Sequence, residues 1–249
     1  MKKKLAIATT VLTVFLSAIL VVASGCAVDR NTDETAELKP LETTEYQGVD
    51  RNTYDAAELK PLEITEYQGK NLSSVDDFSE NSIKGPQYVD IQSYQLKITG
   101  LIEHPKTYTY EEVVNNHIGY KKVVTLNCVE GWSATILWEG LLVSDLIAES
   151  TPLPNAKVVI FHAYDGYTSS LPLDYIIDND ILIAYKMNGI AMPPERGSPF
   201  QLVAESKWGY KWIKWITEIE LSDDVAYRGF WESAGFSNNA DLDKDFLEE

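Results

Sequence analysis

The chain has 249 residues, of which 38 are acidic and 21 are basic, and its formal net charge at pH 7 is −17. This charge argues against general nucleic-acid binding and against attachment to anionic lipid through basic patches. Hydrophobic residues make up 45% of the sequence, so the chain is long and apolar enough to bury a sizeable core.

The N-terminal segment, residues 1–25, is predicted to be a lipoprotein signal peptide. Three lysines precede an apolar stretch from Leu5 to Val22, and small residues then precede Cys26. This order is typical of a secretory signal, and it resembles the bacterial lipobox, in which the cysteine becomes acylated. A transmembrane anchor is the alternative, because an apolar stretch of this length can span a bilayer. We expect a prokaryotic, extracytoplasmic protein anchored to the cell membrane by lipid on Cys26.

A duplicated segment follows the signal. Residues 28–48 and 49–69 are two copies of one 21-residue sequence and are identical at 17 positions. Both copies are acidic and poor in large apolar residues, so they cannot offset the entropy that ordering would cost. The sequence therefore predicts a disordered tether over residues 26–72, a single folded domain over 73–238 and an acidic tail over 239–249.

The folded domain is predicted to contain short strands and helices in an irregular order. Tyr94, Leu96 and Ile98 alternate with polar neighbours, which indicates a half-buried strand. Thr109 and Glu112 form a capping box at the start of a short helix. The later elements are a strand at 121–128, a helix at 141–149, a strand at 156–163, a helix at 172–177, a hairpin around 188–189, and a strand pair at 200–206 and 210–221. Because strands outnumber helices, we expect a mixed α+β fold.

Cys128 lies between a β-branched run and a Gly-Trp turn, in the stretch VVTLNCVEGWS. The chain has two cysteines, so with lipid on Cys26 this thiol has no disulfide partner within the chain. An iron–sulfur cluster or a c-type haem needs more cysteines, and no histidine has a zinc-site spacing from Cys128. The residues leave open a buried hydrophobic cysteine, a Cys–His nucleophile with His162, or a ligand for a metal that brings most of its own ligands.

Residues 186–214 reverse the charge of the chain, with five basic residues against two acidic ones. Lysine and arginine side chains, together with backbone N–H groups, are the groups that bind phosphate. Aromatic residues alternate with these lysines, but the stretch is short for single-stranded nucleic acid and belongs to an acidic protein. The region predicts an anion site. The alternative is a strand with an aromatic core face and solvated lysines.

Taken together, the two regions resemble the sulfite oxidase family of molybdopterin oxidoreductases, and most closely the catalytic subunits of periplasmic methionine-sulfoxide reductases. The stretches that carry the likeness are LNCVEGWSATILWEG, YDGYTSSLPL, LIAYKMNGIAMPPERGSPFQLVAESKWGYKWIKWI and GFWE. The resemblance implies a mixed-sheet, sulfite-oxidase-like molybdopterin-binding fold. It also implies a single domain and a monomer, because the chain has no room for the family's immunoglobulin-like dimerisation domain.

The same resemblance assigns roles to individual residues. Cys128 is implied to be catalytic and to ligate molybdenum, whose other ligands come from the pterin dithiolene and from oxo groups. The positions implied to contact the molybdenum–molybdopterin cofactor are Arg196, Gln201, Lys211, Trp212, Ile213 and Lys214. Glu130, Trp132 and Tyr167 are candidate pocket residues.

The implied function is oxygen-atom transfer on a small substrate at the extracytoplasmic membrane face. A separate membrane cytochrome or quinone-linked protein would exchange the electrons, because the chain has no haem or cluster ligands. The alternative is a cofactor-free binding lipoprotein with the same fold. It is favoured by a signal without twin arginines, by Gln201 in place of the usual arginine, and by the lack of a clear cofactor-contacting segment near Gln87.

Overall fold

The structure is a computed structural model that describes residues 37–40 and 62–247. The predicted signal peptide, Cys26 and most of the two repeats lie outside the described residues. Within the described part of the chain, no helix combines the length and the apolar character that crossing a membrane requires.

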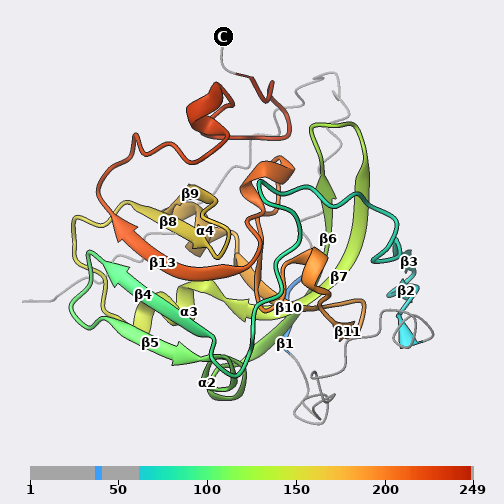
Figure 1. The fold of residues 1–249 in the computed structure, drawn as a ribbon, viewed down its shortest axis with the longest axis horizontal. Coiled ribbons are helices and arrows are strands. Elements are labelled where there is room, and N and C mark those ends of the chain that lie inside the picture. The colour runs from blue at the N-terminus through green and yellow to red at the C-terminus, as the bar shows by residue number, and fades with distance from the viewer. Residues whose placement is uncertain (1–36, 41–61, 248–249) are drawn as a thin grey trace, which may run out of the picture. The chain divides into compact units, whose positions relative to one another are not determined.

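A six-stranded antiparallel sheet and a five-stranded mixed sheet form the domain, and β2 (Glu66–Tyr67) and β3 (Lys70–Asn71) pair in a separate two-stranded sheet (Figure 1). The six-stranded sheet has the order β1-β6-β7-β10-β11, with β12 also paired to β10. Its strands are β1 (Lys39–Pro40), β6 (Gly119–Asn127), β7 (Ser133–Leu142), β10 (Leu182–Met187), β11 (Ile190–Ala191) and β12 (Gln201–Val203). The five-stranded sheet has the order β5-β4-β13-β8-β9. Its strands are β4 (Gln95–Gly100), β5 (Lys106–Thr109), β8 (Val158–Ala163), β9 (Thr168–Pro172) and β13 (Ile216–Ser222).

Short helices and turns connect these strands. The helices are α2 (Tyr110–Asn116), α3 (Val143–Glu149) and α4 (Leu173–Asp178), and the 3-10 turns are η3 (Pro194–Arg196), η4 (Gly209–Lys211) and η5 (Glu232–Ala234). Side chains of both sheets, including Leu96, Trp138 and Phe161, belong to one buried hydrophobic cluster. The architecture confirms the predicted mixed-sheet α+β fold.

Local sequence signals were reliable where the chain reverses or a helix begins. The Thr109 hydroxyl accepts a hydrogen bond from the Glu112 N–H, and the Glu112 carboxylate accepts one from the Thr109 N–H, so the predicted capping box is present. Asn188 and Gly189 join β10 to β11 as predicted, and both residues have a positive φ, +48° and +79°. Such angles favour Asn and Gly.

The predicted strand pair at 200–206 and 210–221 is wrong. β12 pairs with β10 in the six-stranded sheet, whereas β13 pairs with β4 and β8 in the five-stranded sheet. The chain leaves the first sheet through η4, and Trp215, with φ +55°, redirects it into β13. Alternating aromatic and basic residues therefore mark a connection between two sheets and not one strand.

Among the strands of the two large sheets, the sequence did not predict β5, β9 and β7, of which β7 is the longest. It lies between β6 and β10 and is buried on both faces along most of its length, so it lacks the alternation of a half-buried strand. Its last two residues fall inside the predicted helix 141–149, which begins instead at Val143. A Cβ at Gly140 would lie 2.1 Å from the Ile183 carbonyl oxygen, so this position admits only glycine beside β10.

The described end of the second repeat packs against the domain, where the sequence predicts the last part of the tether. Glu63 accepts hydrogen bonds from the Ser74 hydroxyl (2.9 Å), the Val75 N–H (2.7 Å) and the Asn188 side-chain amide (2.8 Å). The Ile64 N–H donates to the Asn188 carbonyl at 2.9 Å. Residues 62–72 therefore fix the position of the segment that follows them.

The predicted acidic tail also contacts the domain. Asp241 pairs with Lys207 at 2.5 Å, and the Phe246 ring packs on the Trp208 ring with 5.6 Å between centroids. An acidic and an apolar side chain of this stretch therefore both contact the domain, which a prediction from its net charge overlooked.

We expect Glu63→Ala to lower the free energy of unfolding by about 1–3 kcal/mol, because it removes three charge-assisted hydrogen bonds at a partly buried position. Urea unfolding followed by tryptophan fluorescence measures the change. Glu66→Ala, in the same segment but at an exposed position, is the control and should change stability by less than about 0.5 kcal/mol. Equal midpoints for the two variants would contradict the packing of this segment.

Candidate active site

Cys128 occupies the turn between β6 and β7. The last strand pair is Asn127 with Ser133, and the Cys128 N–H donates to the Trp132 carbonyl at 2.9 Å. The Gly131 N–H donates back to the Cys128 carbonyl at 3.1 Å, with Gly131 at φ +89°. The thiol is therefore carried by a hydrogen-bonded turn at the end of a long hairpin, which is a rigid support.

The basic region meets this turn directly. Asn127 and Trp208 form a parallel bridge, and a Cβ at Gly209 would lie 3.2 Å from the Asn127 carbonyl oxygen and 3.5 Å from the Cys128 Cα. Because Gly209 has no side chain, η4 can approach the thiol-bearing turn closely. The structure thus brings together the two regions that the sequence singled out.

A cavity of about 270 Å³ adjoins Cys128. Cys128 is 9% exposed and lines this cavity, together with Glu130, Trp132 and Tyr167. The predicted cofactor positions Arg196, Gln201, Trp212, Ile213 and Lys214 also line it. The thiol is therefore not enclosed by apolar neighbours, as a purely structural cysteine would be.

Two cations lie on the η3 side of the cavity. The Arg196 Nε donates to the Val75 carbonyl at 2.8 Å, and its guanidinium lies 4.1 Å from the centroid of the Phe78 ring. Lys214 pairs with Glu80 at 2.7 Å. Burial lowers the pKa of Lys214 from its ordinary value, and the Glu80 carboxylate opposes this shift.

Gly197 leaves room for the Gln201 and Lys214 side chains to lie close together. It adopts φ +110°, and a Cβ there would lie 3.0 Å from the Gln201 Cβ and 3.1 Å from the Lys214 Cβ. Glycine is therefore required both by the backbone angle and by the space between the two side chains. Gln201 is 3% exposed, and its side-chain oxygen has no hydrogen-bond partner within the described chain.

Residues 75–83, which we call the strap, form the part of the site that the sequence did not predict. Phe78, Asn81, Ser82 and Ile83 line the cavity. Phe78 stacks on Trp132 with 5.6 Å between ring centroids, and the Asn81 amide donates to Glu130 at 3.0 Å. The strap lies just upstream of Gln87, in the region where the sequence had no clear counterpart to the reductases' segment. Phe78, the one aromatic residue in this acidic stretch, was the only sequence feature that could have indicated a buried segment here.

Burial and a neighbouring carboxylate both raise the pKa of the Cys128 thiol. Burial raises the pKa of Cys128 above its ordinary value, and the charge of Glu130 raises it further, with Glu130 Oε2 3.9 Å from the sulfur. Backbone N–H groups of Val129 and Glu130 act in the opposite direction. The thiol is thus held protonated in the protein alone. A reactive Cys–His nucleophile needs the reverse, and His162 is not among the cavity residues.

The structure places Lys211 away from the cavity lining. Its side chain is 0% exposed and pairs with the fully buried Glu232 at 2.5 Å. Its Nζ also donates to the Ser170 carbonyl at 3.0 Å. Burial lowers the pKa of Lys211, and the Glu232 charge opposes the shift. The sequence could not distinguish this buried, paired lysine from a phosphate ligand, because both occur in the same basic stretch.

Several other groups give the cavity its walls. The Tyr167 hydroxyl donates to the Tyr210 carbonyl at 2.6 Å, and burial raises the pKa of Tyr167 well above its ordinary value, so the hydroxyl stays protonated. Trp231 and Phe236, from the segment after β13, add aromatic surface. Apart from Cys128 and the two cations, half of the lining residues carry aromatic or amide side chains, and three are acidic, Glu130, Asp165 and Glu195.

The donor set fits a molybdenum–molybdopterin group. A soft thiol lines a cavity beside two cations, and the cavity walls carry two buried polar atoms without partners in the described chain, Gln201 Oε1 and Ser82 Oγ. A pterin offers ring N–H and amine groups for such acceptors, and a phosphate for the cations. The thiolate is a ligand type that suits a transition metal.

Comparison with known proteins agrees with this chemistry. Residues 83–231 match the protein-family model described as "Oxidoreductase molybdopterin binding domain". The chain is 32% identical over 157 residues to the uncharacterized oxidoreductase YuiH of Bacillus subtilis (strain 168), and this match covers 63% of the chain and 78% of YuiH.

Two further matches cover only about half of the other protein. The chain is 30% identical over 147 residues to the protein-methionine-sulfoxide reductase catalytic subunit MsrP of Gluconobacter oxydans (strain 621H), a match that covers 52% of the chain and 47% of MsrP. The crystal structure of the sulfane dehydrogenase SoxCD from Paracoccus pantotrophus matches with a TM-score of 0.58 and 20% identity, over 88% of this chain and 59% of that one. The latter likeness concerns the fold.

Lys211→Met should lower the free energy of unfolding by about 3–5 kcal/mol, because it leaves the buried Glu232 carboxylate without its cation. Lys214→Met, at a site that retains some exposure, should cost about 1 kcal/mol or less. Urea unfolding separates the two. If Lys211→Met instead unfolds like the wild type and loses bound cofactor, Lys211 is the cofactor contact that the sequence predicts.

Proposed function

This chain belongs to the family of oxidoreductases that carry a molybdopterin binding domain, and from that membership we propose that it catalyses oxygen-atom transfer on a small substrate in the Cys128 cavity. The observation that carries the proposal is one thiol beside two cations and two unpartnered buried acceptors, all lining the same cavity. A metal that brings its own organic chelate needs only one protein thiolate.

The cofactor would be held from three sides. Cys128 would ligate the metal, Arg196 and Lys214 would bind the phosphate, and Gln201 and Ser82 would accept hydrogen bonds from the pterin. When bound, this group supplies a two-electron redox centre for oxygen-atom exchange. Gln201 provides an amide where the reductases usually carry an arginine, and Arg196 supplies the second cation beside Lys214.

The remaining cavity residues orient and shield the reaction. The stacked Phe78 and Trp132 rings exclude water from the side of the strap. Glu130 accepts hydrogen bonds from Asn81 and from the Trp132 indole at 3.2 Å, so its carboxylate is positioned beside the thiol. Tyr167 remains a neutral wall, because its hydroxyl is already bonded to a backbone carbonyl.

We propose a small sulfur compound as the substrate class. The names of MsrP and SoxCD both refer to sulfur compounds, and a cavity of about 270 Å³ leaves little space beside a bound pterin. Electrons would come from or go to a separate membrane cytochrome or quinone-linked protein. The support is that the chain has only two cysteines and no Cys-x-x-Cys-His motif, so it lacks the ligands of an iron–sulfur cluster and of a c-type haem.

We also propose that the enzyme works outside the cytoplasm as a monomer, attached through lipid on Cys26. The support is the basic, apolar and small-residue order of residues 1–25, followed directly by cysteine. The acidic repeats would then act as a spacer between the membrane and the domain. Acyl chains, rather than charge, would hold so acidic a protein at the membrane.

Molybdenum content tests the proposed chemistry. Protein purified from its native envelope should contain about one molybdenum per chain by mass spectrometry, and Cys128→Ser should lower turnover by roughly 100-fold or more because the soft ligand is lost. Lys214→Met should lower the molybdenum content, whereas Lys157→Met, an exposed lysine outside the cavity, should not. No molybdenum in protein from a molybdate-replete culture would favour the cofactor-free binding lipoprotein.

The anchor is tested separately, by fractionation. Wild-type protein and Cys128→Ser should both sediment with membranes and be digested by protease added to intact spheroplasts. Cys26→Ser should lose the lipid and move to the soluble fraction. If Cys26→Ser stays in the membrane, residues 5–22 form a transmembrane anchor instead of a cleaved signal.

A further inference from the structure

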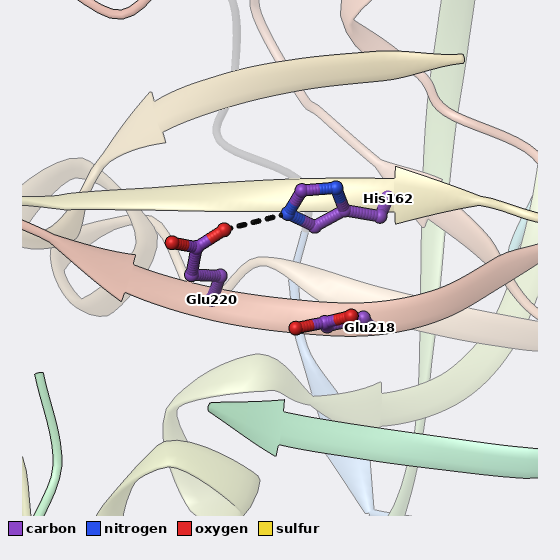
Figure 2. Close-up of side chains that lie close together, drawn as sticks. All are labelled: His162, Glu218 and Glu220. Carbon is purple, nitrogen blue, oxygen red and sulfur yellow. Dashed lines mark hydrogen bonds and ion pairs between the residues drawn. The ribbon is translucent and has the colours of Figure 1, made fainter. Parts of the chain in front are cut away.

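Three side chains that can bind metal converge on the outer side of the five-stranded sheet. Figure 2 shows His162 on β8 and Glu218 and Glu220 on β13, all projecting from the same side of the strand pair. One ligand atom from each lies within 4.8 Å of the other two. None of the three residues lines the Cys128 cavity. We infer that these residues form a second site, which binds a divalent transition-metal ion of the zinc class.

The strand register produces this arrangement. His162 and Glu218 are direct cross-strand partners in the antiparallel β8–β13 pair, so their side chains point to the same face. Glu220 lies two residues further along β13 and shares that face. The backbone of the two strands therefore fixes all three positions, and ordering the site requires only changes of side-chain rotamer.

Hydrogen bonds already orient the ligands. The His162 Nε2 lies 2.8 Å from Glu220 Oε2, and the Thr99 hydroxyl donates to Glu218 Oε1 at 2.6 Å. A hydrogen bond from a neighbouring hydroxyl is the kind of outer contact that holds a ligating carboxylate in place. The His162 and Glu220 side chains are 31% and 37% exposed, so an ion can reach them without opening the core.

The local charge favours a cation. Two carboxylates share the face with one imidazole, and the nearest basic neighbour in the register is Lys97, across from Glu218 on β4. The other cross-strand neighbours, Thr99 on β4 and Thr168 on β9, are uncharged. A simple His–Glu ion pair would use Glu220 alone and would leave the second carboxylate with only Lys97 and a hydroxyl to offset its charge.

The ligand set points to an ion of the zinc class. One imidazole nitrogen and two carboxylate oxygens suit Zn²⁺ and its neighbours better than Ca²⁺ or Mg²⁺, which prefer oxygen ligands throughout. Such ions hold their ligands at about 2.0–2.2 Å, so the three atoms would move closer together on binding. Three protein ligands leave at least one coordination position for water.

A metal at this site would connect the two strands whose continuations reach the cavity. β8 runs into Asp165 and Tyr167, and β13 is preceded by Lys214 and Trp215; all four residues line the cavity. The Tyr164 N–H already donates to the Trp215 carbonyl at 2.9 Å. Cross-linking His162 to Glu218 and Glu220 would therefore stabilise the pair of strands that carries one wall of the site.

Titration of the metal-stripped full chain with Zn²⁺ by calorimetry tests the inference. The wild type should bind one Zn²⁺ that Cys128→Ser also binds, and a hundredfold excess over Kd should raise the midpoint of thermal unfolding by roughly 5–10 °C. His162→Ala and Glu220→Gln should each weaken binding at least about tenfold. Without metal, both variants should unfold close to the wild-type midpoint, since the side chains are partly exposed.

The matched control is His104→Ala, which removes another histidine that lies beside a glutamate, with 3.9 Å between His104 Nε2 and Glu103 Oε2. It should leave Zn²⁺ binding unchanged. Equal weakening by His104→Ala and His162→Ala would show nonspecific binding to the acidic surface and overturn the inference. Loss of the bound Zn²⁺ in Cys128→Ser would assign it to the cavity thiol and also overturn the inference.

Discussion

The contact between the Cys128 turn and the segment around Gly209 is the constraint on which the rest of the site depends. The Asn127–Trp208 bridge joins the end of the β6–β7 hairpin to the chain that connects the two sheets. A side chain at position 209 would press against the Asn127 carbonyl. Because this approach is close, the Cys128 thiol and the cations of Arg196 and Lys214 border one cavity, although they lie about 70–85 residues apart in the sequence. The proposed chemistry needs both groups at one cavity, and this packing places them there.

The strap completes the cavity by supplying the opposite charge. Lys214 already holds Glu80, and Arg196 already donates to the Val75 carbonyl, so neither cation is buried without a partner. A phosphate that binds at Lys214 would replace the Glu80 carboxylate as the partner of this lysine. Because one anion replaces another, binding would not add an unpaired charge at a poorly solvated position, and its free-energy cost is lower. The second repeat contributes indirectly, because Glu63 accepts the Val75 N–H while Arg196 contacts the carbonyl of the same residue. Part of the segment that the sequence predicts to be a tether thus supports the strap.

The sequence predicted what depends on neighbouring residues and missed what depends on distant ones. The Thr109 capping box and the Asn188-Gly189 hairpin are local, and both are present. β7 was missed because burial on both faces removes the alternation that reveals a strand. The pairing of β12 and β13 was wrong because adjacent aromatic stretches enter different sheets. The strap carries no motif of its own, and Lys211 and Lys214 are distinguished by their distant partners, Glu232 and Glu80. The cysteine motif was enough to locate the site in the sequence. The acidic partners of its lysines could be identified only from the folded structure.

The five-stranded sheet does more than complete the core. Its strands β8 and β13 continue into adjacent parts of the cavity wall, so any change in their pairing moves Asp165 and Tyr167 relative to Lys214 and Trp215. The pairing register shifts between Ile216 and Glu218, immediately beside the His162 cluster and close to the point where β13 leaves the cavity. An irregularity of this kind weakens the ladder locally, because one residue loses its regular partner. Side-chain interactions between β8 and β13 at this position, such as that between His162 and Glu220, therefore help to hold the two strands together. Elsewhere in the sheet, backbone hydrogen bonds do this.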